Sequence, residues 1–200
     1  MAVDPDADER GSTETEIMEA TYRALCKHGY SGLSISRIAD EFEKSKSSLY
    51  YHYDSKDDLL VAFLTFAVDR FEASVATERS DDPMADLEGV IERLLPLRPT
   101  DEQRQIQALL VDLRSQAVTD ERFRERFADI DERLVTTLTE VIERGIERGT
   151  FNEVDATRVA EHVLAVLNGA MVARATTDRE AAVAAARVSL SSYLDTVLRR

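Results

Sequence analysis

The sequence predicts an all-α protein with about nine helices. Composition is one reason, because the 200 residues include only 7 Gly and 4 Pro, few for a loop-rich or all-β chain. Periodicity is the other, since apolar residues recur at three- and four-residue spacing in most segments. The chain is 44% hydrophobic, enough to bury a core, and its 32% of charged residues predict good solubility.

We divide the chain into three parts. Residues 1–12 are charged and lack apolar periodicity, which predicts a disordered tail. Residues 13–58 are expected to form an N-terminal domain of three short helices, and residues 59–200 a larger helical domain. The first helix of the larger domain is expected to continue as a strut toward the polar segment 77–83.

The first two helices have clear start and stop signals. Thr13 with Glu16 is the pattern of a capping box, and Gly29 is expected to end the first helix. Ser34 is a suitable N-cap for the second helix. The predicted inward face of the second helix consists of Ile35, Ile38, Ala39 and Phe42.

A tight turn then leads into a short third helix, which Ser45 can cap and which is expected to run to about Tyr53. Ser55 is expected to start a long fourth helix, because acidic residues in its first turn favour the helix dipole. The apolar face of this fourth helix consists of Leu59, Leu60, Phe63, Phe66, Ala67, Phe71 and Val75.

Five further helices are predicted in the C-terminal part. The first covers residues 84–95 and stops at a Pro-rich segment. The other four are expected to begin at polar caps, namely Thr100 (with Gln103 as a capping box), Thr119, Asp155 and Asp178. Gly145 and Gly149 are expected to mark the fraying end of the helix that starts at Thr119, and the last helix should end near Leu198.

The charge distribution is uneven. The formal net charge is −14, yet the four lysines, Lys27, Lys44, Lys46 and Lys56, all lie between residues 27 and 56. An acidic, lysine-poor surface suggests adaptation to high intracellular salt, where a dense carboxylate shell stays hydrated. The alternative is an ordinary acidic protein from a mesophile.

The sequence favours a cytoplasmic protein without a membrane partner. The single cysteine, Cys26, has no partner for an internal disulfide, and the acidic N-terminus does not resemble a secretory signal. The longest weakly polar run, 159–173, is shorter than the roughly 20 apolar residues of a membrane span.

Residues 34–56 have the composition of a helix-turn-helix that reads DNA. A recognition helix presents short polar side chains to base edges, because bulky ones would block entry into the major groove. Serines and lysines from 45 to 48 meet this need, and cations beside the helix suit phosphates. The predicted DNA-binding residues are Ser34, Arg37, Lys44, Ser45, Lys46, Ser47, Ser48, Tyr51, His52 and Lys56.

Three neighbouring side chains, Leu49, Tyr50 and Tyr53, are expected to turn inward and hold the recognition helix. Between residues 23 and 56, six cationic side chains outnumber four anionic ones, against the trend of the whole chain. A plain solvated helix face is the alternative, but it does not explain why every lysine falls here.

Four motifs carry a family resemblance: Gly-Tyr at 29–30, "SISRIA" at 34–39, "SKSSLYYHY" at 45–53 and "SKDDLL" at 55–60. With them, residues 17–60 resemble the TetR family of transcriptional regulators. The resemblance implies a DNA-binding domain followed by a helical domain for ligand binding and dimerisation. One departure is the turn before the recognition helix, where Glu43 and Lys44 replace the family's usual small and aliphatic residues.

The resemblance implies a homodimer that pairs through its last two helices. A two-fold dimer places half-sites about one DNA turn apart, ~34–36 Å, so the operator is expected to be palindromic double-stranded DNA. The residues expected at the dimer interface are Val159, Val163, Val166, Leu167, Ala170, Met171, Ala182, Ala186, Ser189, Tyr193 and Val197.

The resemblance also implies a repressor that a small-molecule effector releases from DNA. The expected pocket residues are Ile91, Leu94, Leu110, Leu113, Phe127, Leu134, Leu138 and His162. For the apolar ones, a role in the core alone remains the alternative. His162 fits a core or interface histidine equally well.

No enzyme is predicted, and neither a cofactor nor a metal site is expected. The chain lacks a Gly-rich phosphate loop, a His-x-x-x-His pair, a cysteine cluster and a nucleophile elbow. Two alternatives to a ligand-responsive repressor remain: a ligand-independent regulator or activator, and a helical module that binds only protein.

Overall fold

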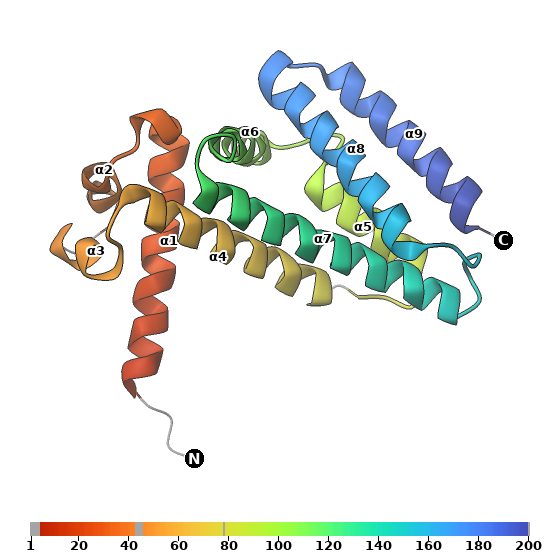
Figure 1. Cartoon of the computed structure of the whole chain (residues 1–200), viewed down its shortest axis with the longest axis horizontal. Coiled ribbons are helices and arrows are strands. Elements are labelled where there is room, and N and C mark those ends of the chain that lie inside the picture. Colours follow the sequence, from red (N-terminus) through yellow and green to blue (C-terminus); the bar gives the residue numbers. More distant parts are fainter. Residues whose placement is uncertain (1–4, 43–45, 78, 200) are drawn as a thin grey trace. The chain divides into compact units, whose positions relative to one another are not determined.

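The computed structural model describes residues 5–42, 46–77 and 79–199 (Figure 1). Within these ranges the chain forms nine helices and no strand, apart from one isolated antiparallel bridge between Phe151 and Arg199. The predicted all-α class is confirmed. The helices are α1 (Pro5–Gly32), α2 (Ile35–Asp40), α3 (Lys46–His52), α4 (Lys56–Thr77), α5 (Pro83–Leu94), α6 (Asp101–Gln116), α7 (Glu121–Glu147), α8 (Ala156–Thr177) and α9 (Glu180–Leu198).

Helix α1 begins at Pro5 rather than at the predicted cap, Thr13. The described part of the expected tail therefore continues the helix, while residues 1–4 lie outside the described residues. Once a helix has formed, each further residue adds a hydrogen bond at small cost, and the segment before Thr13 contains Ala, Glu and Arg, which favour helix. Gly29 interrupts the helix as predicted, with a left-handed φ of 63°.

The chain divides into two compact units, an N-terminal unit, Met1–Asp69, and a C-terminal unit, Arg70–Arg200. The division falls later than the expected boundary at 58/59, because α4 belongs to both units. The first half of α4 contributes buried leucines, including Leu59, Leu60 and Leu64, to the N-terminal unit.

The N-terminal unit has a small helical core. α2 packs against both α1 and α3. The fully buried side chains come from all four helices of this unit and include Ile17, Met18, Leu25, Ile38, Leu49 and Leu59. Helices shorter than ten residues are unstable alone, so α2 and α3 depend on this core for their position.

In the C-terminal unit, α7 and α8 are the central helices. α5 and α6 pack against α7, α6 also packs against α8, and α9 covers another side of α8 (Figure 1). The core of this unit includes Leu87, Leu113, Phe123, Leu138, Ile142 and Val163, all almost fully buried. Within the described residues, no helix is both long and apolar enough to cross a bilayer.

Two predicted helix caps in the C-terminal unit are confirmed. Thr100 and Gln103 form a reciprocal capping box at α6, and the Asp155 carboxylate accepts a hydrogen bond from the Arg158 backbone N–H at 3.0 Å.

Two other predicted caps are wrong. α7 is capped by Asp120, whose carboxylate accepts from the Arg122 N–H at 2.9 Å, and Thr119 belongs to the preceding turn. Asp178 ends α8 in a left-handed conformation, φ 48°, so it does not cap α9. Instead, α9 begins after Arg179 without a side-chain cap.

Gly145 is required by the turn between α7 and α8. The Phe151 ring folds back onto α7, and a Cβ at residue 145 would lie 2.1 Å from that ring. The backbone N–H of Phe151 also donates to the Gly145 carbonyl at 3.0 Å. Gly145, which the sequence predicted to mark the fraying end of this helix, is therefore a buried residue of α7 against which Phe151 packs.

A buried arginine joins four segments of the C-terminal unit. The Arg174 side chain on α8 is only 3% exposed. Its guanidinium donates to the Gln107 side chain on α6 at 2.9 Å and to the Pro96 carbonyl at 2.8 Å. It also donates to the Glu180 carboxylate on α9, which Arg104 contacts as well.

Glu180 is held as a carboxylate by these neighbours. The hydrogen bond from Arg104 contributes most to lowering its pKa, and the hydrogen bond from Arg174 adds to this effect against the opposing effect of burial. A buried guanidinium needs such a partner, because an unpaired buried charge is strongly destabilising.

We expect the Arg174→Met substitution to lower the free energy of unfolding by about 2–4 kcal/mol, because buried acceptors on Gln107 and Pro96 would lose their donor. Guanidinium chloride denaturation followed by circular dichroism measures this change. Arg122→Met, which removes an exposed ion pair with Asp120 at 2.8 Å, is the control and should have little effect. Equal stability of the two variants would contradict the role of Arg174.

Candidate DNA-binding site and regulatory domain

Helix α3 has one buried side and one strongly exposed side. Leu49 is fully buried, whereas Tyr51 is 86% exposed. His52 is also exposed, and its ring meets the Tyr51 ring edge-on at 5.3 Å between centroids. Tyr53 is half-buried, and burial is the main cause that raises its pKa to about 12.

Tyr50 does not turn inward as predicted, since its side chain is 55% exposed. The reason is helical geometry: Tyr53 lies four residues from Leu49 on the same side, whereas Tyr50 is rotated by about 100°. α3 therefore exposes Tyr50 and Tyr51, on different sides of the helix, and both phenol rings are available to a partner.

The N-terminus of α2 is capped by Ser34, as predicted. The Ser34 hydroxyl accepts a hydrogen bond from the Arg37 backbone N–H at 3.3 Å, which confirms the predicted cap. Both side chains are exposed, and the Arg37 guanidinium donates to the Gly32 carbonyl. Arg37 is thus held beside the helix start, where backbone N–H groups attract anions.

The N-terminus of α4 is arranged in a similar way. The Ser55 hydroxyl accepts from the Asp58 N–H at 3.1 Å and donates to the Asp58 carboxylate at 2.6 Å. The Lys56 ammonium lies 3.9 Å from the centroid of the Tyr30 ring and donates to the Tyr30 carbonyl at 3.4 Å. Lys56 therefore connects α4 to the end of α1.

Sequence reasoning missed a cation cluster around Glu41. Lys27 donates to the Glu41 carboxylate at 2.7 Å, and Arg23 donates to the Glu41 carbonyl at 2.8 Å. The hydrogen bond from Lys27 is the main cause that lowers the pKa of Glu41. These contacts join α1 to the end of α2, so two of the six cations in this region stabilise the domain.

Several predicted site residues lie outside what the structure describes. This holds for Lys44, Ser45 and the unusual turn residue Glu43. Lys46, Ser47 and Ser48 lie in the first turn of α3, but their side chains are not among those described.

Two family models match the chain. One, described as bacterial regulatory proteins of the tetR family, matches residues 17–63. The other, described as the C-terminal part of BetI-type transcriptional repressors, matches residues 83–199, more than half of the chain. The chain belongs to the TetR family. It is therefore a DNA-binding transcriptional regulator and not an enzyme, as the sequence predicted.

Individual TetR-family relatives agree with this assignment. A TetR transcription regulator from Haloarcula marismortui is 39% identical, with a TM-score of 0.84 over 94% of this chain and 100% of that chain. The repressor AcnR of Corynebacterium glutamicum is 22% identical over 71% of this chain and 70% of its own length. A regulator from Saccharomonospora viridis, solved with choline, shares the fold at 22% identity, with a TM-score of 0.78 over 95% of this chain and 99% of that chain.

Most of the predicted pocket residues are buried or partly buried in the C-terminal unit. Leu113 and Leu138 are fully buried and Phe127 nearly so, with the Arg114 guanidinium 4.6 Å from the Phe127 ring centroid. Leu134 is buried and Leu94 and Leu110 are partly buried. A role in the core alone, the alternative for these apolar positions, accounts for this burial equally well.

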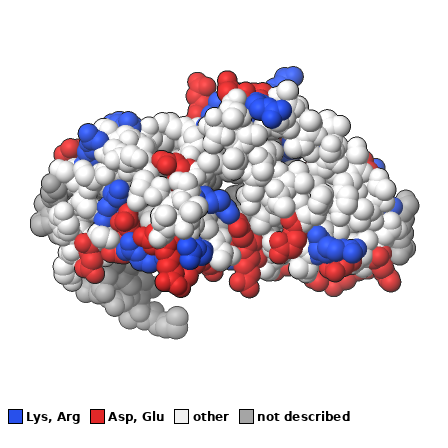
Figure 2. All heavy atoms as spheres, turned by 45° about the horizontal axis from the view of Figure 1, so that its top comes forward, with Lys and Arg blue, Asp and Glu red and all other residues white. Residues whose placement is uncertain are grey.

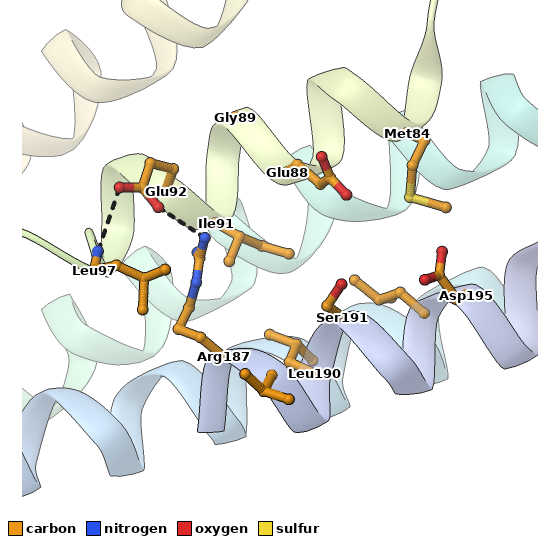
Figure 3. Close-up of a pocket in the computed structure, with 12 residues that line it drawn as sticks. Met84, Glu88, Gly89, Ile91, Glu92, Leu97, Arg187, Leu190, Ser191 and Asp195 are labelled. Atoms are coloured by element: carbon orange, nitrogen blue, oxygen red, sulfur yellow. Dashed lines mark hydrogen bonds and ion pairs between the residues drawn. The ribbon is translucent and has the colours of Figure 1, made fainter. Parts of the chain in front are cut away.

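One hollow in the described residues lies between α5 and α9 (Figure 3). Of the predicted pocket residues, only Ile91 lines it. His162 is exposed on α8, and its ring packs on Tyr193 of α9 with 4.4 Å between centroids. His162 therefore lies at the surface of the α8–α9 pair.

The predicted dimer faces divide into two groups. Val159, Val163, Leu167 and Ala170 are buried within the single chain, because this side of α8 packs on α6 and α7. They are unavailable to a second copy. The remaining residues are partly or fully exposed: Val166, Met171, Ala182, Ala186, Ser189, Tyr193 and Val197.

Among the described residues, no group of three or more His, Cys, Asp or Glu is arranged to hold a metal ion. Cys26 on α1 is partly buried. Acidic and basic side chains lie beside one another on the face drawn in Figure 2.

Two substitutions on α3 distinguish a side chain that contacts DNA from one that stabilises the fold. Leu49→Ala is expected to cost about 2–4 kcal/mol of unfolding free energy, because the leucine is fully buried. Tyr51→Ala should change stability by less than about 0.5 kcal/mol but weaken operator binding roughly tenfold. Thermal denaturation and fluorescence anisotropy measure the two effects. Unchanged DNA affinity for Tyr51→Ala would exclude this side chain from the interface.

Proposed function

We propose that this regulator is a homodimeric repressor that binds a palindromic operator and is released by a small-molecule effector. The observation that carries the DNA contact is the exposed side of α3, where Tyr50, Tyr51 and His52 project from a helix anchored by Leu49. In a helix-turn-helix, this is the side that enters the major groove.

The proposed interface has contacts of two kinds. Residues at the start of α3, including Lys46, Ser47 and Ser48, are assigned to base edges, together with Tyr51. Ser34, Arg37, His52 and Lys56 are assigned to phosphates, because they lie at helix ends or are cationic. Ser45 is assigned to base edges and Lys44 to the DNA contact beside it, and both lie outside the described residues.

The exposed side of the α8–α9 pair is the proposed dimer face. Val172 on α8 is 43% exposed and supplies an apolar contact to this face. On the same exposed side of α8 lie Ala165 and Gly169, whose small size permits close helix approach. The His162–Tyr193 ring pair supplies an aromatic contact beside them.

The effector acts, in this proposal, by favouring one geometry of the dimer. A ligand shifts such an equilibrium only by the difference in its affinity for the two states. Support for an effector comes from the regulator of Saccharomonospora viridis solved with choline. A ligand-independent regulator or an activator is the second candidate.

We also propose that the protein works in a salt-rich cytoplasm. Its net charge of −14 and its four lysines support this, as does the similarity to a regulator from Haloarcula marismortui, a halophile. High salt weakens phosphate contacts, because counterions released into a concentrated salt solution gain less entropy. Base contacts and shape therefore have to carry more of the operator affinity.

The double substitution Lys46→Glu with Ser47→Glu is expected to abolish the specific operator complex, because two new carboxylates would face DNA. A gel shift with the protein's own upstream region in KCl buffer measures this. Arg98→Glu with Ser115→Glu, two exposed positions in the C-terminal unit, makes the same change in charge and should bind normally. Normal binding by the α3 variant would refute the proposed reading helix.

The substitution Val172→Glu is expected to raise the dimer dissociation constant roughly tenfold or more, because it would bury a charge in the interface. Light scattering coupled to size-exclusion chromatography reports the mass. Val118→Glu is the matched control, since Val118 is 77% exposed in the turn after α6. If both variants remain dimers, the assigned face is wrong.

A further inference from the structure

A groove of about 540 Å³ lies between α5 and α9 in the C-terminal unit (Figure 3). This volume is within the range of small-molecule sites, about 300–1,000 Å³. Each wall is a row of side chains spaced four residues apart, so each row occupies one side of its helix. The rows are Met84, Glu88 and Glu92 on α5, and Arg187, Ser191 and Asp195 on α9.

The two helices run antiparallel along the groove. Glu92 lies opposite Arg187 at one end, and Met84 lies opposite Asp195 at the other (Figure 3). Glu88 faces Ser191 in the middle. The groove thus has two ends of different chemistry.

At one end of the groove, Arg187 forms an ion pair with Glu92. Arg187 donates to one Glu92 oxygen at 2.7 Å, and the Leu97 backbone N–H donates to the other at 3.3 Å. The Arg187 side chain is 15% exposed, and burial is the main cause that lowers its pKa, opposed by the charges of Glu92 and Glu88. Its Nη1 group is buried and makes no hydrogen bond to the described residues.

The middle and the other end are acidic. Glu88 and Asp195 are both exposed carboxylates, and the Ser191 hydroxyl lies between them along the groove. Asp195 pairs with Arg199 at 2.6 Å, but both partners are at least half exposed, so the pair is weak and exchangeable. Among the described residues that line the groove, Arg187 is the single cation, against the three carboxylates of Glu88, Glu92 and Asp195.

The floor and rim are apolar. Ile91, Leu190 and Leu194 are buried and form the floor. Leu97 and Val188 lie at the rim and are 48% and 68% exposed. Large apolar side chains exposed beside a hollow indicate an occupant with an apolar body.

We propose that this groove binds an organic cation with an apolar chain, specifically a primary alkylammonium. Its three N–H donors match the oxygens of Glu88, Ser191 and Asp195, and its chain lies over Ile91 and Leu190. The inference deepens the effector-responsive function proposed above and rests on it only for the consequence on DNA. The site lies outside the predicted pocket residues, apart from Ile91.

The test uses isothermal titration calorimetry with n-octylammonium on the full-length protein in KCl buffer. The matched probes are n-octanoate, which has the opposite charge, and 1-octanol, which has none. We expect saturable binding of one n-octylammonium per chain, and binding of n-octanoate at least roughly tenfold weaker, because of the unlike charges. Failure of n-octylammonium to bind saturably, or equal binding of n-octanoate, would overturn the proposal.

Two variants locate the site. Gly89→Leu adds a bulky side chain at a residue that lines the groove; a Cβ at Gly89 would meet only the Arg93 guanidinium at 3.6 Å, so the fold should tolerate it. Glu88→Arg reverses the charge and should raise the dissociation constant roughly tenfold or more. Glu125→Arg, an exposed position on α7, is the control for net charge and should bind like the wild type. Unchanged affinity of Gly89→Leu would place the cation elsewhere and refute the groove.

A separate measurement tests the regulatory function. Operator binding is followed with and without saturating n-octylammonium for the wild type and Gly89→Leu. If the cation binds in the groove but leaves the operator complex unchanged, the site stands and the effector-responsive function fails. If the cation weakens the operator complex in the wild type and not in Gly89→Leu, both the groove site and the effector-responsive function are supported.

Discussion

The C-terminal unit depends on the burial of one side of α8. Val159, Val163 and Leu167 are at most 1% exposed, because α6 and α7 pack against this side of the helix. Arg174 lies further along the same side of α8, and its buried guanidinium donates hydrogen bonds to Gln107 on α6 and to the Pro96 carbonyl. Since one helix side is fully used within the chain, only the opposite side is left for a second copy. The fold therefore determines both its own core and the surface on which dimerisation is proposed.

Features that depend on residues close in sequence were predictable. Ser34, Thr100 and Asp155 cap their helices as predicted, because a cap involves partners only three residues away. The motifs around the recognition helix gave the family and the fold class for the same reason. Errors arose where two local signals compete, as at Thr119 and Asp120, or where a short helix offers too few positions to define its buried side, as at Tyr50.

Features that join distant segments were not predictable from one sequence. Arg174 and Gln107 are 67 residues apart, and Arg187 and Glu92 are 95 apart. No periodicity indicates which helices meet, so the core arginine and the groove between α5 and α9 emerge only in the folded chain. The pocket residues inferred from apolar spacing stay a prediction, because spacing reports which side of a helix is buried and not whether a cavity lies beneath it.

The internal contacts of two lysines bear on how the regulator responds to changes in cell salt. Lys27 binds Glu41 and Lys56 contacts Tyr30, so half of the lysines already have partners inside the N-terminal unit. Each phosphate neutralised adds about 0.9 to the slope of log affinity against log salt. Lys27, which is held by Glu41, is not among the proposed phosphate contacts, so the salt dependence of operator binding would come from other cations, namely Arg37, Lys44, Lys46 and Lys56.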